Sequence, residues 1–260
     1  MGRDMPVRSE LTPPILTLTL DRPKANAFDQ AELDALSAAV TEAEGVEGAR
    51  VLVLLAAGER AFSAGADLTG VGPFGEPDGF ARWTRQAHAT LDRIADFPVP
   101  VIAAMQRPAV GGGFELALAC HLRVLGRGAH LGLPEIRRGY LPSWAGLERL
   151  VPLVGLGLAT ELVLTGRNVP AEEALARGLV HQVADDADRA ARELAETLAK
   201  LPPLALRAAL GQLRGLGRGD DRETVRAREI ADLERLVRTE DTVEGVLAFL
   251  EKREPVFRGR

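Results

Sequence analysis

The sequence predicts an α/β fold, with a mixed body over residues 1–200 and a helical region over residues 201–260. Short apolar runs that suit strands alternate with segments of helical periodicity in the first part. From Asp186 onward the pattern is almost wholly helical. We find no repeat of fixed period and no low-complexity linker, so the two parts follow one another directly.

The chain opens with a predicted strand and a predicted helix. Residues 15–20 alternate apolar and Thr side chains, the period-two pattern of a half-buried strand. Residues 29–43 place apolar side chains at helical spacing, and Asp29 can serve as the N-cap.

The middle of the chain repeats this order. Residues 51–56 and 99–104 are continuous apolar runs rich in branched side chains, which suits strands covered on both faces. Residues 78–97 between them have helical spacing, and a buried helix is expected over residues 114–120, entered through Gly111–Gly113. Further strands are expected at residues 122–125 and 180–183. Breaks at Pro202–Pro203 and Gly215–Gly219 divide the helical region.

Composition excludes several classes of protein. The net charge of −5 gives no general electrostatic attraction for nucleic acid. No run approaches the roughly 18 apolar residues of a membrane span, so we expect no membrane partner and a cytoplasmic location. The only cysteine, Cys120, lies in an apolar run and is expected to be inert core. His and Cys show no metal-ligand spacing, and no metal is expected.

Small residues are concentrated where the chain leaves two of the apolar strands. Ala61–Leu68 follows the first, and Val110–Glu115 follows the second. Open α/β sheets bind ligands at the carboxyl ends of their strands, and Gly or Ala lets backbone N–H groups approach a ligand closely. One amide from each segment can therefore converge on a carbonyl oxygen that becomes an enolate. The alternative is that the glycines only make tight turns and permit close helix packing.

Two glutamates accompany these bends. Glu115 follows the glycines inside an otherwise apolar helix, and Glu135 follows Pro134 in a loop. Apolar surroundings raise a carboxyl pKa, and two close carboxylates titrate apart, so the pair can divide acid and base roles. The structural alternative is a salt bridge to a neighbour such as Arg123 or Arg137.

The chain resembles the enoyl-CoA hydratase/isomerase, or crotonase, family over nearly its whole length. The matching runs are Arg22–Asn26, Ala61–Asp67, Pro100–Ala104, Gly111–Cys120, Pro134–Glu135, Leu164–Gly166, Ala171–Ala174 and Ala248–Phe257. The resemblance implies a crotonase-like spiral of β-β-α units with a C-terminal helical trimerisation region, assembled as a homotrimer or as a homohexamer that is a dimer of trimers.

The resemblance also implies the site. The oxyanion-hole amides would be those of Ala66 and Gly112, and an acyl-CoA or enoyl-CoA substrate would bring coenzyme A as part of itself, with no separate cofactor. Coenzyme A would pass along the residues that match the family's binding segment, with the tail completing the site: Lys24, Ala25, Ala64, Asp67, Leu68, Lys252 and Phe257.

Family hydratases carry glutamate at both matched positions, which favours enoyl-CoA hydration here. Glu115 would deprotonate the water and Glu135 would supply or remove the α proton. Two alternatives remain open. One is another crotonase reaction, namely isomerisation, dehydration of a hydroxyacyl-CoA, hydrolysis or decarboxylation. The other is an acyl-CoA-binding member without turnover.

The chain departs from the family pattern after Glu135. Ser143 stands where a glycine amide helps to hold the catalytic water, and Trp144 adds bulk that either shortens the acyl pocket or packs under the loop. His121 replaces a frequent aspartate, with an expected structural role. His88 falls off its apolar stripe and is expected to be exposed. Residues 70–79 form the variable pocket wall, so the acyl group is not identified.

Overall fold

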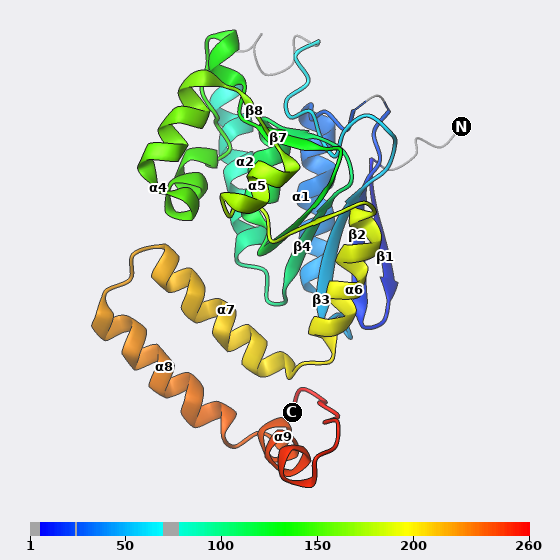
Figure 1. Ribbon diagram of the computed structural model, residues 1–260, viewed down its shortest axis with the longest axis vertical. Coiled ribbons are helices and arrows are strands. Elements are labelled where there is room, and N and C mark those ends of the chain that lie inside the picture. Colours follow the sequence, from blue (N-terminus) through cyan, green and yellow to red (C-terminus); the bar gives the residue numbers. More distant parts are fainter. Residues whose placement is uncertain (1–5, 24, 70–77) are drawn as a thin grey trace.

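The computed structural model describes residues 6–23, 25–69 and 78–260. A sheet with helices packed against it forms the body, and the last helices extend away from it (Figure 1).

Within these ranges the strands form two sheets. The larger has the order β1-β2-β3-β4-β6-β9, and the smaller has the order β5-β7-β8. β1 is antiparallel to β2, and the other neighbours in the larger sheet are parallel. The strands are β1 (Val7–Thr12), β2 (Ile15–Leu20), β3 (Val51–Ala56), β4 (Val101–Met105), β5 (Ala109–Val110), β6 (Leu122–Gly126), β7 (His130–Gly132), β8 (Asn168–Pro170) and β9 (Gln182–Ala184).

Helices alternate with these strands through the body, and the last four helices follow one another after β9. They are α1 (Gln30–Glu44), α2 (Gly79–Ala95), α3 (Gly112–Ala119), the 3₁₀ helix η2 (Glu135–Arg138), α4 (Gly146–Thr165), α5 (Ala171–Ala176), α6 (Ala187–Ala199), α7 (Pro203–Gly217), α8 (Arg222–Leu236) and α9 (Glu240–Glu251).

Local sequence signals decide most of these boundaries. The predicted strands at residues 15–20 and 51–56 are confirmed with the same bounds. Asp29 caps α1 through a capping box with Glu32, because each side chain accepts a hydrogen bond from the other residue's N–H. β1 was not predicted, because apart from Val7 all of its residues are exposed and its side chains show no alternation.

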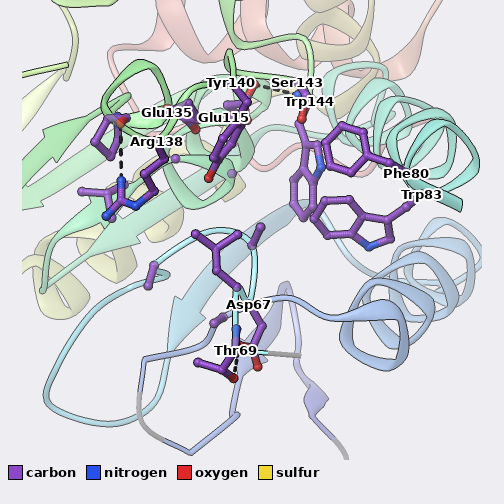
Figure 2. A pocket seen from close by; sticks show the side chains of 18 residues that line it. Asp67, Thr69, Phe80, Trp83, Glu115, Glu135, Arg138, Tyr140, Ser143 and Trp144 are labelled. Atoms are coloured by element: carbon purple, nitrogen blue, oxygen red, sulfur yellow. Dashed lines mark hydrogen bonds between the residues drawn. The ribbon is translucent and has the colours of Figure 1, made fainter. Parts of the chain in front are cut away.

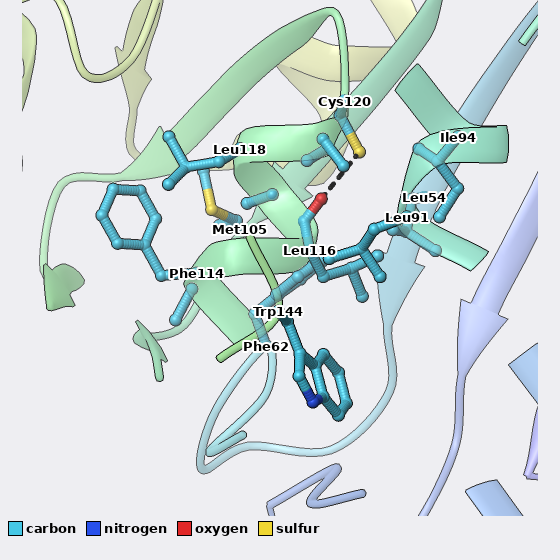
Figure 3. Packing of buried hydrophobic residues seen from close by; sticks show 14 of the residues in the cluster. Leu54, Phe62, Leu91, Ile94, Met105, Phe114, Leu116, Leu118, Cys120 and Trp144 are labelled. Carbon is cyan, nitrogen blue, oxygen red and sulfur yellow. Dashed lines mark hydrogen bonds between the residues drawn. The ribbon is translucent and has the colours of Figure 1, made fainter. Parts of the chain in front are cut away.

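The core gathers around α3, which is buried along its whole length. Figure 3 shows apolar side chains from α3, from β4 and from the loop that carries Trp144 in one cluster. Cys120 belongs to this cluster, and its thiol contacts the Leu116 carbonyl at 3.5 Å. Burial raises the Cys120 pKa to about 12, so the predicted inert core role is confirmed.

The C-terminal helices differ from the rest in their packing. Buried alanines of α6 pack against side chains of β3, β4 and β6. α7, α8 and α9 lie to one side of the body, with the C-terminus beside α9 (Figure 1). A division into domains at residues 200 and 201 stays a prediction. In the described ranges, every helix is too short or too polar to cross a bilayer.

Candidate active site

The two small-residue segments that the sequence singles out, Ala61–Leu68 and Val110–Glu115, are here called the two bends. They lie against each other. Phe62 N donates to Pro108 O at 2.9 Å, and Val110 N donates to Ser63 O at 3.0 Å. A Cβ built on Gly65 would lie 2.7 Å from Gly112 N, closer than any real side chain allows. Glycine is therefore required at 65, where φ is +78° and the two backbones meet.

Each bend offers one backbone N–H at this meeting point. A parallel bridge pairs Phe28 with Ala66, and its hydrogen bonds use Gly65 O and Asp67 N, which leaves the Ala66 N–H out of the ladder. Gly112 is the first residue of α3, where helical N–H groups lack an intrahelical partner. Within the described ranges neither N–H donates a hydrogen bond. Both are thus available to an oxygen atom.

Glu115 lies one turn into α3, and its side chain is 2% exposed. Its Oε1 accepts hydrogen bonds from Trp144 N and Gly146 N, each at 2.8 Å. Ala145 between them has the left-handed φ of +63° and is the N-cap of α4. This turn directs two alternate N–H groups and the positive end of α4 at one carboxylate oxygen, which is an arrangement that binds anions.

Glu135 begins η2 and is 4% exposed. Its Oε1 would lie 2.9 Å from a Cβ on Gly111, so the carboxylate reaches the glycine bend. Its Oε2 is buried and has no hydrogen-bond partner among the described residues. A buried acceptor without a partner is rare and is explained by a proton, a water or a ligand.

Burial raises the pKa of both carboxyl groups to about 7. For Glu115 the second cause is repulsion by the negative charge of Glu135, while the two N–H groups and Arg149 oppose the shift. Near neutral pH one carboxyl can therefore hold a proton while the other is ionised. This is the condition that acid and base catalysis by a pair requires.

The salt-bridge alternative is wrong for the described structure. The Arg123 guanidinium donates to the backbone carbonyls of Leu179 and Cys120. Arg137 donates to the Thr165 carbonyl. Neither arginine pairs with Glu115 or Glu135 within the described residues: Glu115 is bound by the N–H groups of Trp144 and Gly146, and Glu135 reaches the bend at Gly111.

A cavity of about 270 Å³ contains these groups. Figure 2 shows Tyr140, Glu135 and Arg138 on one side, Phe80, Trp83 and Trp144 on another, and Asp67 opposite them. The described residues that line it are Ala27, Ala64, Ala66, Asp67, Leu68, Thr69, Phe80, Trp83, Val110, Gly111, Gly112, Glu115, Pro134, Glu135, Arg138, Tyr140, Ser143 and Trp144.

Trp144 fills part of this space. It is 1% exposed, and its ring lies 3.1 Å from where a Cβ on Gly112 would be. It makes edge contacts with Phe28 and Trp83 at centroid distances of 5.2 and 5.1 Å. Packing under the loop and narrowing of the pocket were the two alternatives for Trp144. The ring does both, since it packs against Phe28 and Trp83 and also narrows the cavity beside Gly112.

His88 is not solvent-exposed, and that expectation was wrong. It is half-buried on α2, and its Nε2 lies 2.7 Å from the Ser143 carbonyl oxygen. The apolar stripe of α2 correctly predicted that His88 does not lie on the face that packs into the core. The face that carries His88 is nevertheless covered, because it contacts the loop before α4. Ser143 lines the cavity as expected. His121 has the predicted structural role, since its ring joins Val101 N and Ala95 O.

The predicted coenzyme A segment is only partly at the cavity. Ala64, Asp67 and Leu68 line it. Ala25 lines a second cavity of about 440 Å³, and its carbonyl accepts the Ala64 N–H at 3.0 Å. The Asp67 carboxylate already accepts hydrogen bonds from Arg22 at 2.8 Å and from Thr69 N at 2.9 Å. Asp67 therefore holds the bend in shape. Lys24 lies outside the described residues.

The structure does not bring the predicted tail residues to the cavity of their own chain. Lys252 ends α9 with a φ of +54°. Phe257 packs near Gly245 of the same helix, and its carbonyl accepts a hydrogen bond from Arg50 at 2.8 Å. Neither residue lines the cavity that holds Glu115.

Sequence reasoning did not select Arg138, Tyr140 or Arg149. Arg138 and Tyr140 line the cavity after Glu135. Burial and the neighbouring Glu135 raise the Tyr140 pKa, so its phenol keeps its proton. Arg149 donates to the Trp144 carbonyl at 3.1 Å. The available signal was their short distance in sequence from Glu135 and Gly146. Within the described ranges no three His, Cys, Asp or Glu side chains are grouped to hold a metal.

The chain is similar to known proteins over nearly its whole length. The chain is 38% identical over 252 residues to a protein named carnitinyl-CoA dehydratase from Salmonella typhimurium, with 95% of this chain and 96% of that protein covered. It superposes on an enoyl-CoA hydratase from Bacillus anthracis with a TM-score of 0.91 at 35% identity, covering 98% of this chain and 100% of the other.

An enoyl-CoA hydratase from Polaromonas gives a TM-score of 0.91 at 29% identity, with 97% of this chain and 99% of the other covered. The model of the enoyl-CoA hydratase/isomerase family matches residues 11–260. The fold is thus the crotonase fold, and the chain belongs to the enoyl-CoA hydratase/isomerase family.

Proposed function

We propose that the protein catalyses the reversible addition of water to a 2-enoyl-CoA thioester. The observation that carries this proposal is the meeting of two unpaired N–H groups, from Ala66 and Gly112, in a cavity that also holds two buried carboxyl groups. The amides would bind the thioester oxygen and stabilise the enolate-like charge that develops on it.

The two carboxyl groups would then exchange protons with water and substrate. Ionised Glu115 takes a proton from water as the hydroxyl oxygen bonds to the β carbon. The electron pair of the double bond moves into the enolate and then forms the new Cα–H bond with the proton that protonated Glu135 gives up. Dehydration is the same sequence reversed. With a pKa of about 7 on each carboxyl, one can be ionised while the other is protonated, and the two N–H groups that bind Glu115 favour it as the ionised one.

Coenzyme A would enter as part of the substrate, and no separate cofactor takes part in these steps. Ala25 lines one cavity and Ala64 lines the other, and the hydrogen bond between their backbones places the two residues side by side, so the pantetheine chain would run along this segment. Lys252 and Phe257 would contribute only if the tail of a second copy approached the site. That requirement agrees with a homotrimer or homohexamer.

The narrowing by Trp144 favours short acyl groups. A cavity of about 270 Å³ is slightly smaller than the roughly 300–1,000 Å³ typical of ligand sites. A panel of short, branched, aromatic and long enoyl-CoA and hydroxyacyl-CoA thioesters, with product mass analysis, tests this. Turnover of the hydroxyacyl-CoA thioesters would favour physiological dehydration, which the similarity to carnitinyl-CoA dehydratase supports. Tight binding without any turnover would instead indicate an acyl-CoA-binding protein.

The decisive variant is Glu135→Gln, which keeps the shape of the side chain and removes its proton transfer. We expect crotonyl-CoA hydration to fall by about 10² or more, while coenzyme A binding measured by calorimetry stays unchanged. Loss of absorbance of the conjugated thioester follows the reaction. Glu196→Gln on the exposed face of α6 is the matched control and should keep full activity. Full activity in Glu135→Gln would refute the mechanism.

A further inference from the structure

The loop between η2 and α4 is bound by Glu115 on one side and by the side chains of His88 and Arg149 on the other. Its N–H groups at Trp144 and Gly146 bind the Glu115 carboxylate at 2.8 Å. Its Ser143 and Trp144 carbonyl groups are bound by other side chains, His88 of α2 and Arg149 of α4. The Ser143 carbonyl lies 2.7 Å from His88 Nε2, and because a carbonyl can only accept, Nε2 carries the hydrogen.

A second contact from α2 reaches the next carbonyl. Asp92 lies one turn after His88, and its Oδ1 is 2.6 Å from Arg149 Nη2. Arg149 Nη1 donates to the Trp144 carbonyl at 3.1 Å. The Arg149 side chain is 12% exposed, whereas that of Asp92 is 55% exposed. α2 therefore holds two consecutive carbonyl groups of the loop, one directly and one through Arg149.

These contacts maintain a backbone shape that the loop alone would not favour. Ala145 has a φ of +63°, a region in which a residue with a Cβ is disfavoured. Such a conformation persists only where the surrounding structure holds it. Here the Ser143 and Trp144 carbonyls point toward His88 and Arg149, whereas the Trp144 and Gly146 N–H groups point toward Glu115.

We propose that His88 is a positioning residue for Glu115, assisted by Asp92 acting through Arg149. This inference rests on the proposed hydratase function only for its kinetic consequence. Without the His88 contact, the loop relaxes, the N–H groups of Trp144 and Gly146 align less well, and the ionised carboxylate of Glu115 loses stabilisation.

The pKa of Glu115 measures the positioning effect of His88 directly, and it can be determined without any turnover of substrate. The charged and titratable groups around Glu115 are Glu135, Tyr140 and Arg149, with His88 and Asp92 on α2. Carbon-13 NMR of labelled glutamate side chains, assigned with Glu115→Gln, would follow its pKa. We expect His88→Ala to raise this pKa by about half a unit or more, because two hydrogen bonds that lower it are weakened.

Kinetics supply the second measure. In His88→Ala we expect kcat to fall by about tenfold, KM for crotonyl-CoA to change less, and the limb of the pH profile that reports Glu115 to move to higher pH. His88→Gln keeps an N–H donor of similar reach and should restore most of the activity and the original limb. The glutamine does not titrate, so the restored limb would exclude His88 itself as its source.

Two further variants, one in the contact through Arg149 and one control, separate the positioning effect from a general effect of changing α2. Asp92→Asn changes a largely exposed side chain, should fold, and should shift Glu115 in the same direction by less. Combined with His88→Ala it should give less than the sum of the single effects, because both act through one loop. Arg85→Ala on the exposed face of α2 is the control and should change nothing.

The outcomes separate the two proposals. An unchanged Glu115 pKa in both His88→Ala and Asp92→Asn overturns the positioning role, whatever the activity. A shifted pKa in a protein that hydrates no enoyl-CoA supports the positioning role and refutes the proposed function.

Discussion

Gly146 lies directly against the carboxylate of Glu115. It donates its N–H to Oε1 at 2.8 Å, and a Cβ on it would lie 2.6 Å from the same oxygen. Only glycine allows both the donation and the clearance. Gly146 lies at the first position of α4, where the helical backbone does not itself require glycine. Glycine is needed because a Cβ would meet the Glu115 side chain.

Gly146→Ala should therefore displace the Glu115 carboxylate. We expect enoyl-CoA hydration to fall by about 10² while the fold is kept, since a general base contributes of this order. Gly157→Ala is the control in the same helix, because a Cβ there meets nothing within 4 Å. Steady-state kinetics of both variants, with circular dichroism to check the fold, make the comparison. Equal activity in the two would contradict the proposed geometry.

Glu115 also affects stability. Burial raises its pKa from 4.5 to about 7, so between these values the folded state keeps a proton that the unfolded state has lost. Stability linked to this group is present at pH 4.5 and is lost as pH rises to 7. At 1.36 kcal/mol per pKa unit, the cost above pH 7 is about 3 kcal/mol.

Glu115→Gln removes this cost and can still accept both N–H groups. We expect its melting temperature to exceed that of the native protein by an amount that grows between pH 5 and pH 8. Calorimetry at one protein concentration measures the difference, with Glu196→Gln as the control. A difference that does not grow with pH would show that Glu115 is not buried in its ionised form.

At the scale of elements, the site depends on close contact between the bend after β3 and the start of α3. A Cβ on Gly113 would lie 2.4 Å from Ser63 O, which is backbone and cannot move aside cheaply. The contact places the Ala66 and Gly112 amides together. It is made between residues about 50 positions apart in the sequence, and the adjacent strands β3 and β4 bring them together.

Gly113→Ala should push these elements apart. Overpacking of this kind costs about 1–3 kcal/mol, and a backbone obstacle favours the upper part of that range. The denaturant midpoint should fall and activity should fall with it. Gly128→Ala, where a Cβ meets nothing within 4 Å, is the control and should match the native protein. Unchanged stability in Gly113→Ala would mean that the two backbones are farther apart than described.

At the scale of the molecule, the C-terminal helices expose much apolar surface. α8 has no buried residue, yet it carries exposed Ile230 and Leu233. On α9, Phe249 is 82% exposed. Large exposed apolar groups gathered on neighbouring elements indicate an interaction surface. We expect these helices to bury this surface against other copies of the chain.

Light scattering should accordingly give three or six times the 27.8 kDa mass of one chain. Leu233→Glu should reduce that mass, because a charge would be buried at the contact. Leu11→Glu, a matched change on the edge strand β1, should leave it unaltered. A native protein that remains monomeric at micromolar concentration would refute the predicted assembly.

Local signals in the sequence determined much of this protein. Alternation identified β2, Asp29 identified the start of α1, and the Gly and Ala bends with Glu115 and Glu135 identified part of the cavity lining. Such features depend on neighbouring residues or on residue type, so they can be seen in one sequence. The short strands β5, β7 and β8 lack such a signal, since each is held by partners elsewhere in the chain.

Only the tertiary structure decided how the site is held. His88 contacts a carbonyl 55 positions away, and Arg149 links the same loop to Asp92. The tertiary structure also revealed that Trp144 narrows the cavity beside Gly112. It further showed that Lys252 and Phe257 lie away from the cavity of their own chain. Hydrogen bonds and steric limits act over a few ångströms in space, and no pattern of nearby residues specifies which distant groups come that close.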